Sequence, residues 1–192
     1  MDNQSQKSKF LSNIVDYVEL FAIAVCVVIL LFSFVFRTCT VDGDSMNQTL
    51  HDGEVVVVSD LFYTPKRGDI IVFHQTDSSA MSGRNKALVK RVLGLGGDTV
   101  KIDYDSWTVS VTDKDGEVHQ LDQSYIYLSK RGNRFSGNAE YKVPEGSLFV
   151  LGDNRNESLD SRYSDIGFVD ARRVLGKVIF RVTPFNKMGF VG

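Results

Sequence analysis

The pattern of apolar and polar positions divides the chain into two parts. From Leu20 to Phe36 every residue is apolar or small and uncharged, and no polar stripe interrupts the run. A helix of this length spans about 25 Å at about 1.5 Å per residue, which is close to the thickness of the hydrocarbon core of a bilayer. The run therefore predicts a transmembrane helix at residues 20–36.

A cleaved secretory signal is the main alternative for this run. Its apolar core is usually about 7 to 15 residues long and is followed by a small-residue cleavage site, whereas Phe36-Arg37-Thr38-Cys39 follows here. A buried core helix is disfavoured because it would show a polar stripe. We expect a retained single-pass anchor in the cell membrane, with Tyr17 at one interface of the lipid bilayer and Arg37 at the other.

Beyond Phe36 the chain changes to short apolar runs that are separated by turn residues. Runs of this length, rich in β-branched residues, are typical of β-strands. Six segments have the pattern: Glu54–Val58, Asp69–Phe73, Ala87–Leu93, Trp107–Val111, Ser147–Leu151 and Lys177–Val182. No comparable amphipathic helix appears. The predicted fold class is mainly β, with one extramembrane β domain at residues 37–192 preceded by one N-terminal transmembrane helix.

Polar segments separate the predicted strands. Asp113–Glu117 divides two alternating segments and predicts a hairpin turn, in which Gly116 supplies the positive φ. Longer irregular segments are expected at Gln75–Lys86 and at Gln123–Tyr141. We find no internal repeat.

Composition and charge restrict the possible partners. The chain has 192 residues, of which 43% are hydrophobic, with a formal net charge of −2. It is long enough for one packed core, and the charges beyond Phe36 nearly balance, so nothing favours a nucleic-acid partner. Cys26 lies in the predicted membrane helix and Cys39 lies beyond its end, so the two cysteines cannot readily form a disulfide. No metal-ligand spacing occurs, so neither a metal nor another cofactor is expected.

The side of the membrane is only weakly indicated by charge. Lys7 and Lys9 flank the apolar run on one side and Arg37 on the other. We expect residues 1–19 to be a short cytoplasmic tail, which places residues 37–192 on the extracytoplasmic side.

A serine and a lysine in the β part suggest catalytic chemistry. Ser45 lies in Gly43-Asp44-Ser45-Met46, and Lys90 lies between Leu88-Val89 and Val92-Leu93. A serine hydroxyl is a poor nucleophile until a base removes its proton. Burial among apolar residues lowers the pKa of a lysine, to roughly 7 to 8 in enzymes that use one as a base. Either residue alone is more often structural, but together they suggest a Ser-Lys pair.

Two further blocks accompany this pair. The glycine-rich segment Gly94–Asp98 follows Lys90, and a dense polar run from Gly152 to Arg162 follows an apolar strand. Such a polar run is costly to order unless its members form a network or a site.

The blocks closely resemble the sequence boxes of the type I signal peptidases, and their order fits nearly the whole chain. Gly43-Asp44-Ser45-Met46 with Thr49-Leu50 is similar to the nucleophile box, and Arg67–Phe73 to the strand box that follows. Lys90–Leu95 with Gly97-Asp98 resembles the general-base box, and Gly152–Arg155 with Ser158, Asp160, Ser161 and Arg162 resembles the last box.

The resemblance implies a membrane-bound serine endopeptidase that removes N-terminal signal peptides from secreted preproteins. In that family mechanism Ser45 attacks the scissile carbonyl, Lys90 acts as general base, and Ser158 orients the lysine amine. The resemblance also implies a wall of the substrate pocket at Met46 and supporting ion pairs among Asp153, Asp160, Arg162 and Arg91.

Three positions depart from the family pattern. Gln48 and Gly96 stand where proline is common in the family. Without proline the φ angle at each position is free, so the conformation of both loops is less restricted. Gly43 stands where some relatives have a serine hydroxyl. The backbone N–H of Ser45 is therefore the expected first donor to the oxyanion, and the second donor is left open.

Three other functions compete with this one. A non-catalytic signal-peptidase-like assembly factor that binds pilin or surface-protein precursors is favoured by the altered loops, but retention of Ser45 and Lys90 weighs against it. A Ser-His-Asp enzyme would need His51, His74 or His119, and none lies in a motif with a recognisable partner. A self-cleaving repressor would need a DNA-binding helix-turn-helix where this chain has its apolar run.

Overall fold

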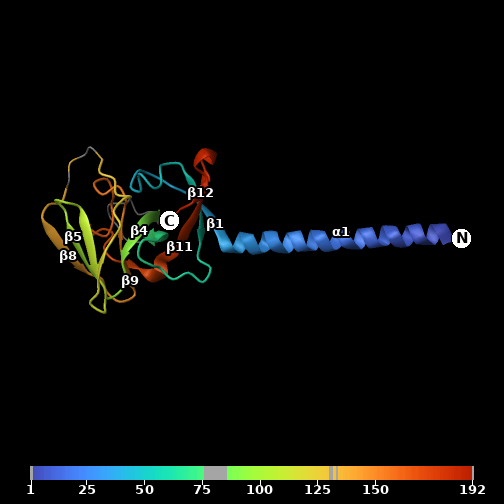
Figure 1. The fold of residues 1–192 in the computed structure, drawn as a ribbon, viewed down its shortest axis with the longest axis horizontal. Helices are drawn as coiled ribbons and strands as arrows, with labels where there is room; N and C mark the ends of the chain where they lie inside the picture. The colour runs from blue at the N-terminus through green and yellow to red at the C-terminus, as the bar shows by residue number, and fades with distance from the viewer. Residues whose placement is uncertain (1, 76–85, 130–131, 133, 192) are drawn as a thin grey trace. The chain divides into compact units, whose positions relative to one another are not determined.

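The computed structural model describes residues 2–75, 86–129, 132 and 134–191. The chain forms two compact units, residues 1–37 and residues 38–192. Helix α1 (Asp2–Val35) makes up nearly all of the first unit. The second unit is the mainly β domain drawn in Figure 1. The predicted class, a mainly β protein with one N-terminal apolar helix, is confirmed.

Helix α1 is longer than the apolar run that predicted it. It continues through the polar residues before Leu20, and it ends at Val35, so that Phe36 already belongs to the first strand. Its most apolar stretch, Asn13–Leu30, has a mean hydropathy of 2.2 and none of it is buried. The helix is thus long and apolar enough to cross a bilayer, and its boundaries differ from the predicted residues 20–36 at both ends.

The larger sheet has the order β1-β2-β11-β3-β4-β9-β10, with β12 paired to β11. Its strands are β1 (Phe36–Thr40), β2 (Val55–Ser59), β3 (Ile70–Gln75), β4 (Lys86–Gly94), β9 (Ser147–Leu151), β10 (Val169–Asp170), β11 (Val174–Thr183) and β12 (Gly189–Phe190). The pairs around β4 are antiparallel, with β3 on one side and β9 on the other. Strand β4 therefore lies inside the sheet, and β1 lies at its edge.

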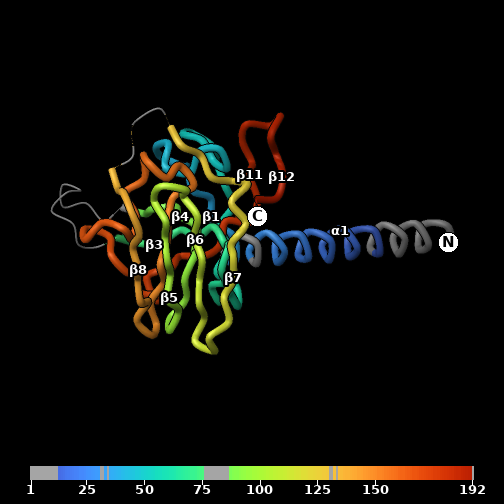
Figure 2. The backbone as a smooth tube through the Cα atoms, turned by 60° about the vertical axis from the view of Figure 1, so that its left-hand side comes forward, coloured from blue at the N-terminus to red at the C-terminus, as the bar shows by residue number. Residues whose placement is uncertain are grey.

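The smaller sheet has the order β7-β6-β5-β8, as the tube in Figure 2 shows. Its strands are β5 (Thr99–Asp103), β6 (Thr108–Thr112), β7 (Val118–Gln120) and β8 (Asn138–Lys142). Two short 3-10 helices, η2 (Ala171–Arg173) and η3 (Phe185–Lys187), flank β11. The predicted hairpin turn is confirmed, since Asp113 N donates to Glu117 O at 2.9 Å and Gly116 has φ +85°.

Residues Ile70–Phe73 of strand β3 are all apolar because both faces of the strand are buried there. Ile70 and Val72 pack into the hydrophobic cluster that contains Met46, whereas Ile71 and Phe73 pack into a second cluster on the other face of the sheet. A strand buried on both faces has no solvent side, so its sequence does not alternate. A third cluster forms under the smaller sheet around Trp107.

All six predicted strands are present, with ends shifted by up to three residues. The prediction of an irregular segment at Gln123–Tyr141 is wrong at its end, because Asn138–Lys142 forms β8. The polar residues of β8 alternate with Ala139 and Tyr141, which pack against the core, and β5 supplies the backbone partners. Most of the predicted loop between Gln75 and Lys86 lies outside the described residues.

Candidate active site

The structure brings Ser45 and Lys90 together. Lys90 lies in β4, where it pairs with Ile71 of β3, and Ser45 lies five residues after the end of β1. The Lys90 Nζ donates to Ser45 Oγ at 2.7 Å and to the carbonyl oxygen of Val89 at 3.0 Å. Lys90 is only 3% exposed. An amine next to a serine hydroxyl and shielded from water is the arrangement that a lysine base requires.

A groove of about 220 Å³ gives access to this pair. Its walls come from the segment Thr40–Met46 on one side and from Ala87–Lys90 on the other. Met46, the predicted pocket wall, lines the groove and is almost fully buried. Ser45 therefore lies at an opening in the surface of the β domain.

Asn154 fixes the backbone on both sides of the serine. Its N–H donates to the carbonyl oxygen of Ser45 at 3.0 Å, and its side-chain Nδ2 donates to the carbonyl oxygen of Asp44 at 3.0 Å. The sequence prediction included Asn154 in a motif but gave it no role. The sequence signal for this role was its place in the polar run, directly after Asp153. A buried side-chain amide in such a run needs hydrogen-bond partners.

Gly152 lies where the polar run Gly152–Arg162 touches the segment Gly43–Met46, which is called the serine segment below. A Cβ at this position would overlap both Ser158 Oγ and the carbonyl oxygen of Ser45. The Gly152 N–H donates to Asp160 Oδ2 at 3.1 Å. Only glycine allows the two segments to approach this closely, so Gly152 sets the distance between the serine segment and the polar run.

Ser158 lies beside the serine segment but does not make the predicted contact. Among the described residues its buried Oγ has no hydrogen-bond partner, so the predicted bond to the Lys90 amine is not formed in this structure. Lys90 instead donates to Ser45 and Val89. The orienting role of Ser158 stays a prediction.

The predicted ion pairs are present and buried. Arg91 binds Asp153 through two hydrogen bonds, of 2.9 and 2.8 Å, and Arg162 binds Asp160 through two, of 2.7 and 2.8 Å. Burial opposes the charge of Arg91, but Asp153 outweighs it, so the pKa of Arg91 is raised. Because Arg91 follows Lys90 in β4, fixing Arg91 also fixes the backbone that carries the lysine.

Two more residues belong to this network, and the sequence prediction gave neither of them a role. Thr49 Oγ1 donates to Asp153 Oδ2, which ties the turn after Ser45 to the ion pair. Arg155 is 1% exposed and donates from Nε to the carbonyl oxygen of Gly152 at 3.1 Å. Burial lowers the pKa of Arg155. The polar run is therefore ordered by its own network and by its contacts with the serine segment.

Asp153→Asn is expected to destabilise the protein strongly. The change leaves Arg91 buried without its charged partner, and breaking a buried ion pair typically costs about 3 to 5 kcal/mol. Glu140→Gln is the matched control, since Glu140 pairs with Lys101 at 3.4 Å on the surface, where such pairs contribute below about 1 kcal/mol. Urea unfolding measures both variants. Equal losses of unfolding free energy in the two variants would show that the buried ion pair contributes no more to stability than the surface pair.

Two of the departures from the family pattern have local explanations. A Cβ at Gly96 would lie 2.9 Å from the backbone N of Gly146, so the backbone of the neighbouring turn approaches closely at this point. Gly43 has φ +88°, a conformation that favours glycine, and its N–H donates to Asp52 Oδ1 at 2.7 Å.

Two of the three histidines lie beside carboxylates. His119 Nε2 lies 2.8 Å from Asp113 Oδ2, and His51 Nδ1 lies 3.4 Å from Glu54 Oε1. The sequence showed no motif partner for either histidine, and neither of these two pairs includes Ser45. Asp113, Glu117 and His119 are also the group of possible metal-ligating side chains found in the described part of the chain. They lie at the β6–β7 hairpin, on the smaller sheet, whereas Lys90 lies on the larger one.

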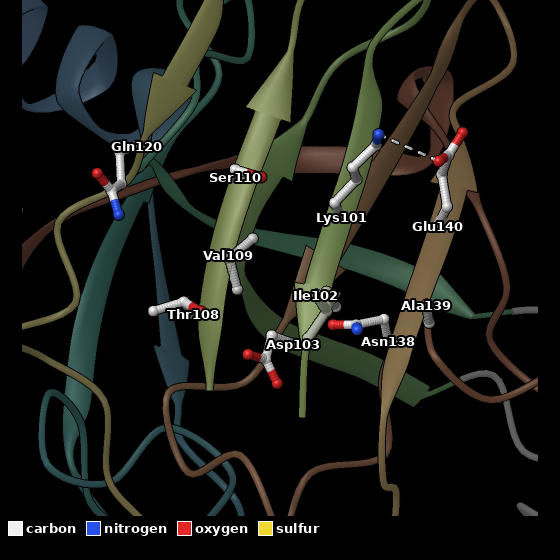
Figure 3. Close-up of a pocket in the computed structure, with 10 residues that line it drawn as sticks. All are labelled: Lys101, Ile102, Asp103, Thr108, Val109, Ser110, Gln120, Asn138, Ala139 and Glu140. Carbon is white, nitrogen blue, oxygen red and sulfur yellow. Dashed lines mark ion pairs between the residues drawn. The ribbon is translucent and has the colours of Figure 1, made fainter. Parts of the chain in front are cut away.

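A second hollow, of about 440 Å³, lies over the smaller sheet and is drawn in Figure 3. Its side chains come from β5, β6, β7 and β8 and are mostly polar. Lys101 there pairs with Glu140, and its side chain is 58% exposed. The chemistry is therefore expected at the groove of Ser45.

Comparisons with known proteins show which family the chain belongs to. The family model for signal peptidase, peptidase S26, matches residues 14–183. The chain is 35% identical over 181 residues to a signal peptidase I of Bacillus licheniformis, covering 92% of each chain. It is 32% identical over 188 residues to a signal peptidase IB of Staphylococcus aureus strain COL, covering 91% of this chain and 92% of that one.

Among solved structures, a signal peptidase I from Enterococcus faecalis V583 aligns with a TM-score of 0.45 and 31% identity, covering 60% of this chain and 97% of that one. The family match and the curated relatives place the chain among the peptidases. It belongs to the signal peptidase family, peptidase S26.

Proposed function

We propose that this protein is a membrane-bound serine endopeptidase that removes N-terminal signal peptides from secreted preproteins. Ser45 is the nucleophile and Lys90 the general base. The observation that carries the proposal is the 2.7 Å hydrogen bond between a buried lysine amine and a serine hydroxyl at an open groove, in a chain of this family. No cofactor takes part in this chemistry.

The mechanism uses the two groups in sequence. Ser45 Oγ attacks the scissile carbonyl while Lys90 Nζ accepts the hydroxyl proton, which requires an uncharged amine. Lys90 then protonates the leaving amine, and a water molecule activated by the same lysine releases the acyl group from Ser45. The backbone N–H of Ser45 stabilises the oxyanion. Ser158 orients the amine during turnover, and Met46 forms a wall of the pocket for the residue before the cut.

The membrane arrangement follows from the proposed substrate. Residues 1–19 form a cytoplasmic tail, residues 20–36 the anchor, and residues 37–192 the extracytoplasmic catalytic domain. Apolar helix α1 supports the anchor. Tethering beside the bilayer raises the effective concentration of a cleavage site that emerges from the same membrane.

Cleavage of a preprotein in detergent tests the function. The purified full chain is incubated with a preprotein that carries an Ala-X-Ala site, and the new N-terminus of the product is sequenced. One new N-terminus directly after the second alanine is expected. A preprotein with both alanines replaced by bulky residues is the control. Binding of the preprotein without cleavage at any pH would contradict the proposal and favour a binding-only protein.

The two curated relatives from Bacillus licheniformis and Staphylococcus aureus are both named signal peptidases. They give no support to the non-catalytic assembly factor that the altered Gln48 and Gly96 loops had suggested.

The proposed mechanism predicts the pH dependence of the reaction. At low pH the ammonium form of Lys90 has no lone pair to accept the serine proton, so kcat/KM should rise with pH as this amine loses its proton. The measurement is a pH profile of kcat/KM for the wild type and for His119→Gln, in which the rising limb should be unchanged. A rising limb that disappears in the histidine variant would contradict the lysine assignment.

A further inference from the structure

Trp107, the only tryptophan of the chain, lies in the turn between β5 and β6 and has a left-handed backbone conformation. Its φ is +57°, where a bulky side chain is rarely found because the conformation is strained. Such strain persists only where the surrounding structure holds the residue in place. The side chain is buried in the cluster under the smaller sheet. The contacts of its ring should therefore explain why a tryptophan stands at this position.

One of these contacts is with a buried cation of the polar run. The Arg162 Cζ lies 5.3 Å from the centre of the Trp107 ring and 5.1 Å from the centre of the Phe135 ring. A cation–π contact gains strength when the cation is shielded from water, and the Arg162 side chain is fully buried. Its Nη1 has no hydrogen-bond partner among the described residues. The two rings are thus a main source of stabilisation for this guanidinium.

The same guanidinium holds the polar run at two points. Its Nε and Nη2 donate to Asp160 Oδ1 and Oδ2 at 2.7 and 2.8 Å, and Nη2 also donates to the carbonyl oxygen of Arg155 at 2.6 Å. The Asp160 carboxylate in turn accepts from the Gly152 N–H at 3.1 Å. The position of the Arg162 guanidinium therefore determines where the carboxylate that binds Gly152 lies.

Gly152 and Asn154 connect this network to the serine segment. The backbone of Gly152 lies so close to the carbonyl oxygen of Ser45 that a Cβ there would overlap it. The N–H of Asn154 donates to the same oxygen at 3.0 Å. A displacement of the Arg162 guanidinium therefore reaches Ser45 through Gly152. A shift of about 1 Å at a reacting group costs about 10² in rate, so even a smaller shift of Ser45 should lower kcat.

We propose that Trp107 is a positioning residue for the Ser45–Lys90 pair and acts by holding the Arg162 guanidinium against Asp160. This inference rests on the proposed function. Through this ring the smaller sheet contributes to a reaction whose base, Lys90, lies in the larger sheet.

Replacement of Trp107 in the full chain tests this role. Trp107→Leu removes the ring face and keeps an apolar side chain. The kcat for an Ala-X-Ala preprotein should fall about tenfold, while KM stays within about twofold because the walls of the groove are unchanged. Trp107→Phe keeps an aromatic face over Arg162 and should keep kcat within about threefold of the wild type. Each rate is measured at a temperature at which a thermal melt shows the variant folded.

Val111→Ala is the matched control for a loss of stability. Val111 is fully buried in the same cluster and has no ring to place over Arg162. The variant should melt at a lower temperature and keep the wild-type kcat while it is folded. Arg162→Lys tests the connection, since lysine cannot form the planar bidentate pair with Asp160. In that background Trp107→Leu should change kcat by less than about twofold.

A kcat of Trp107→Leu that falls no further than that of Val111→Ala would overturn the positioning role and leave the proposed function intact. Equal losses from Trp107→Leu with and without Arg162→Lys would overturn the assignment to Arg162. Should Trp107→Leu fail to fold, the phenylalanine variant decides, and a loss of about tenfold or more despite its ring would overturn the role. Failure of the wild type to cut the preprotein would overturn the proposed function and this role with it.

Discussion

Lys90→Met is expected to lower kcat/KM by about 10³-fold or more, since general base catalysis contributes about 10² to 10⁴ and no other described side chain donates to Ser45 Oγ. Methionine keeps most of the volume of the buried lysine stem and removes the amine. The loss should therefore appear without a large fall in melting temperature. The measurement is the cleavage rate of an Ala-X-Ala preprotein, together with a thermal melt of each protein.

Lys101→Met is the matched control for this change. Lys101 is an exposed lysine of β5 that pairs with Glu140, so its removal should leave the cleavage rate unchanged. A Lys90 variant that cuts within a few-fold of the wild-type rate would show that another group takes the serine proton. A rate that falls only in step with unfolding would show that Lys90 is structural.

Gly152→Ala is expected to lower kcat/KM by about 100-fold. The new Cβ overlaps Ser158 Oγ and the carbonyl oxygen of Ser45, so the serine segment must move away from the polar run. A displacement of about 1 Å at a reacting group costs about 10² in rate. The same overlap is expected to cost about 1 to 3 kcal/mol of stability, as overpacking does elsewhere. Steady-state cleavage and urea unfolding measure the two effects separately.

Gly189→Ala provides the comparison. A Cβ added at Gly189 in β12 would meet no atom within 4 Å, so alanine should be tolerated there in both assays. If Gly152→Ala folded and cut preprotein as fast as Gly189→Ala, the close approach at Gly152 would not be needed to place Ser45.

The sequence predicted the larger sheet better than the smaller one. Strands such as β3 and β9 are buried on both faces, and their unbroken apolar runs are visible without any structure. Strand β5 was missed because Lys101 and Asp103, residue types that are depleted in strands, interrupt its apolar residues. Strand β8 is polar and depends on β5 for its backbone partners. Pairing between distant segments does not show in a local pattern.

The site was predicted by resemblance more than by pattern. Ser45 and Lys90 are separated by 45 residues, and nothing in their spacing requires contact. The apolar neighbours of Lys90 suggested the pair and the matching boxes supported it, and in the structure Lys90 Nζ lies 2.7 Å from Ser45 Oγ. The roles of Gly152 and Asn154 were not predicted, because they depend on how closely two segments approach. The bond predicted from Ser158 is not formed, since the position of a hydroxyl depends on backbone geometry that a motif does not specify.

The most direct test of the central claim is single-turnover cleavage of an Ala-X-Ala preprotein by Ser45→Ala, with enzyme in excess over substrate. Alanine removes the hydroxyl that Lys90 contacts and leaves the rest of the groove in place. The proposed mechanism predicts product at the level of a reaction without enzyme, while the wild type cuts after the second alanine. Cleavage of the same bond by Ser45→Ala at a rate near that of the wild type would contradict it.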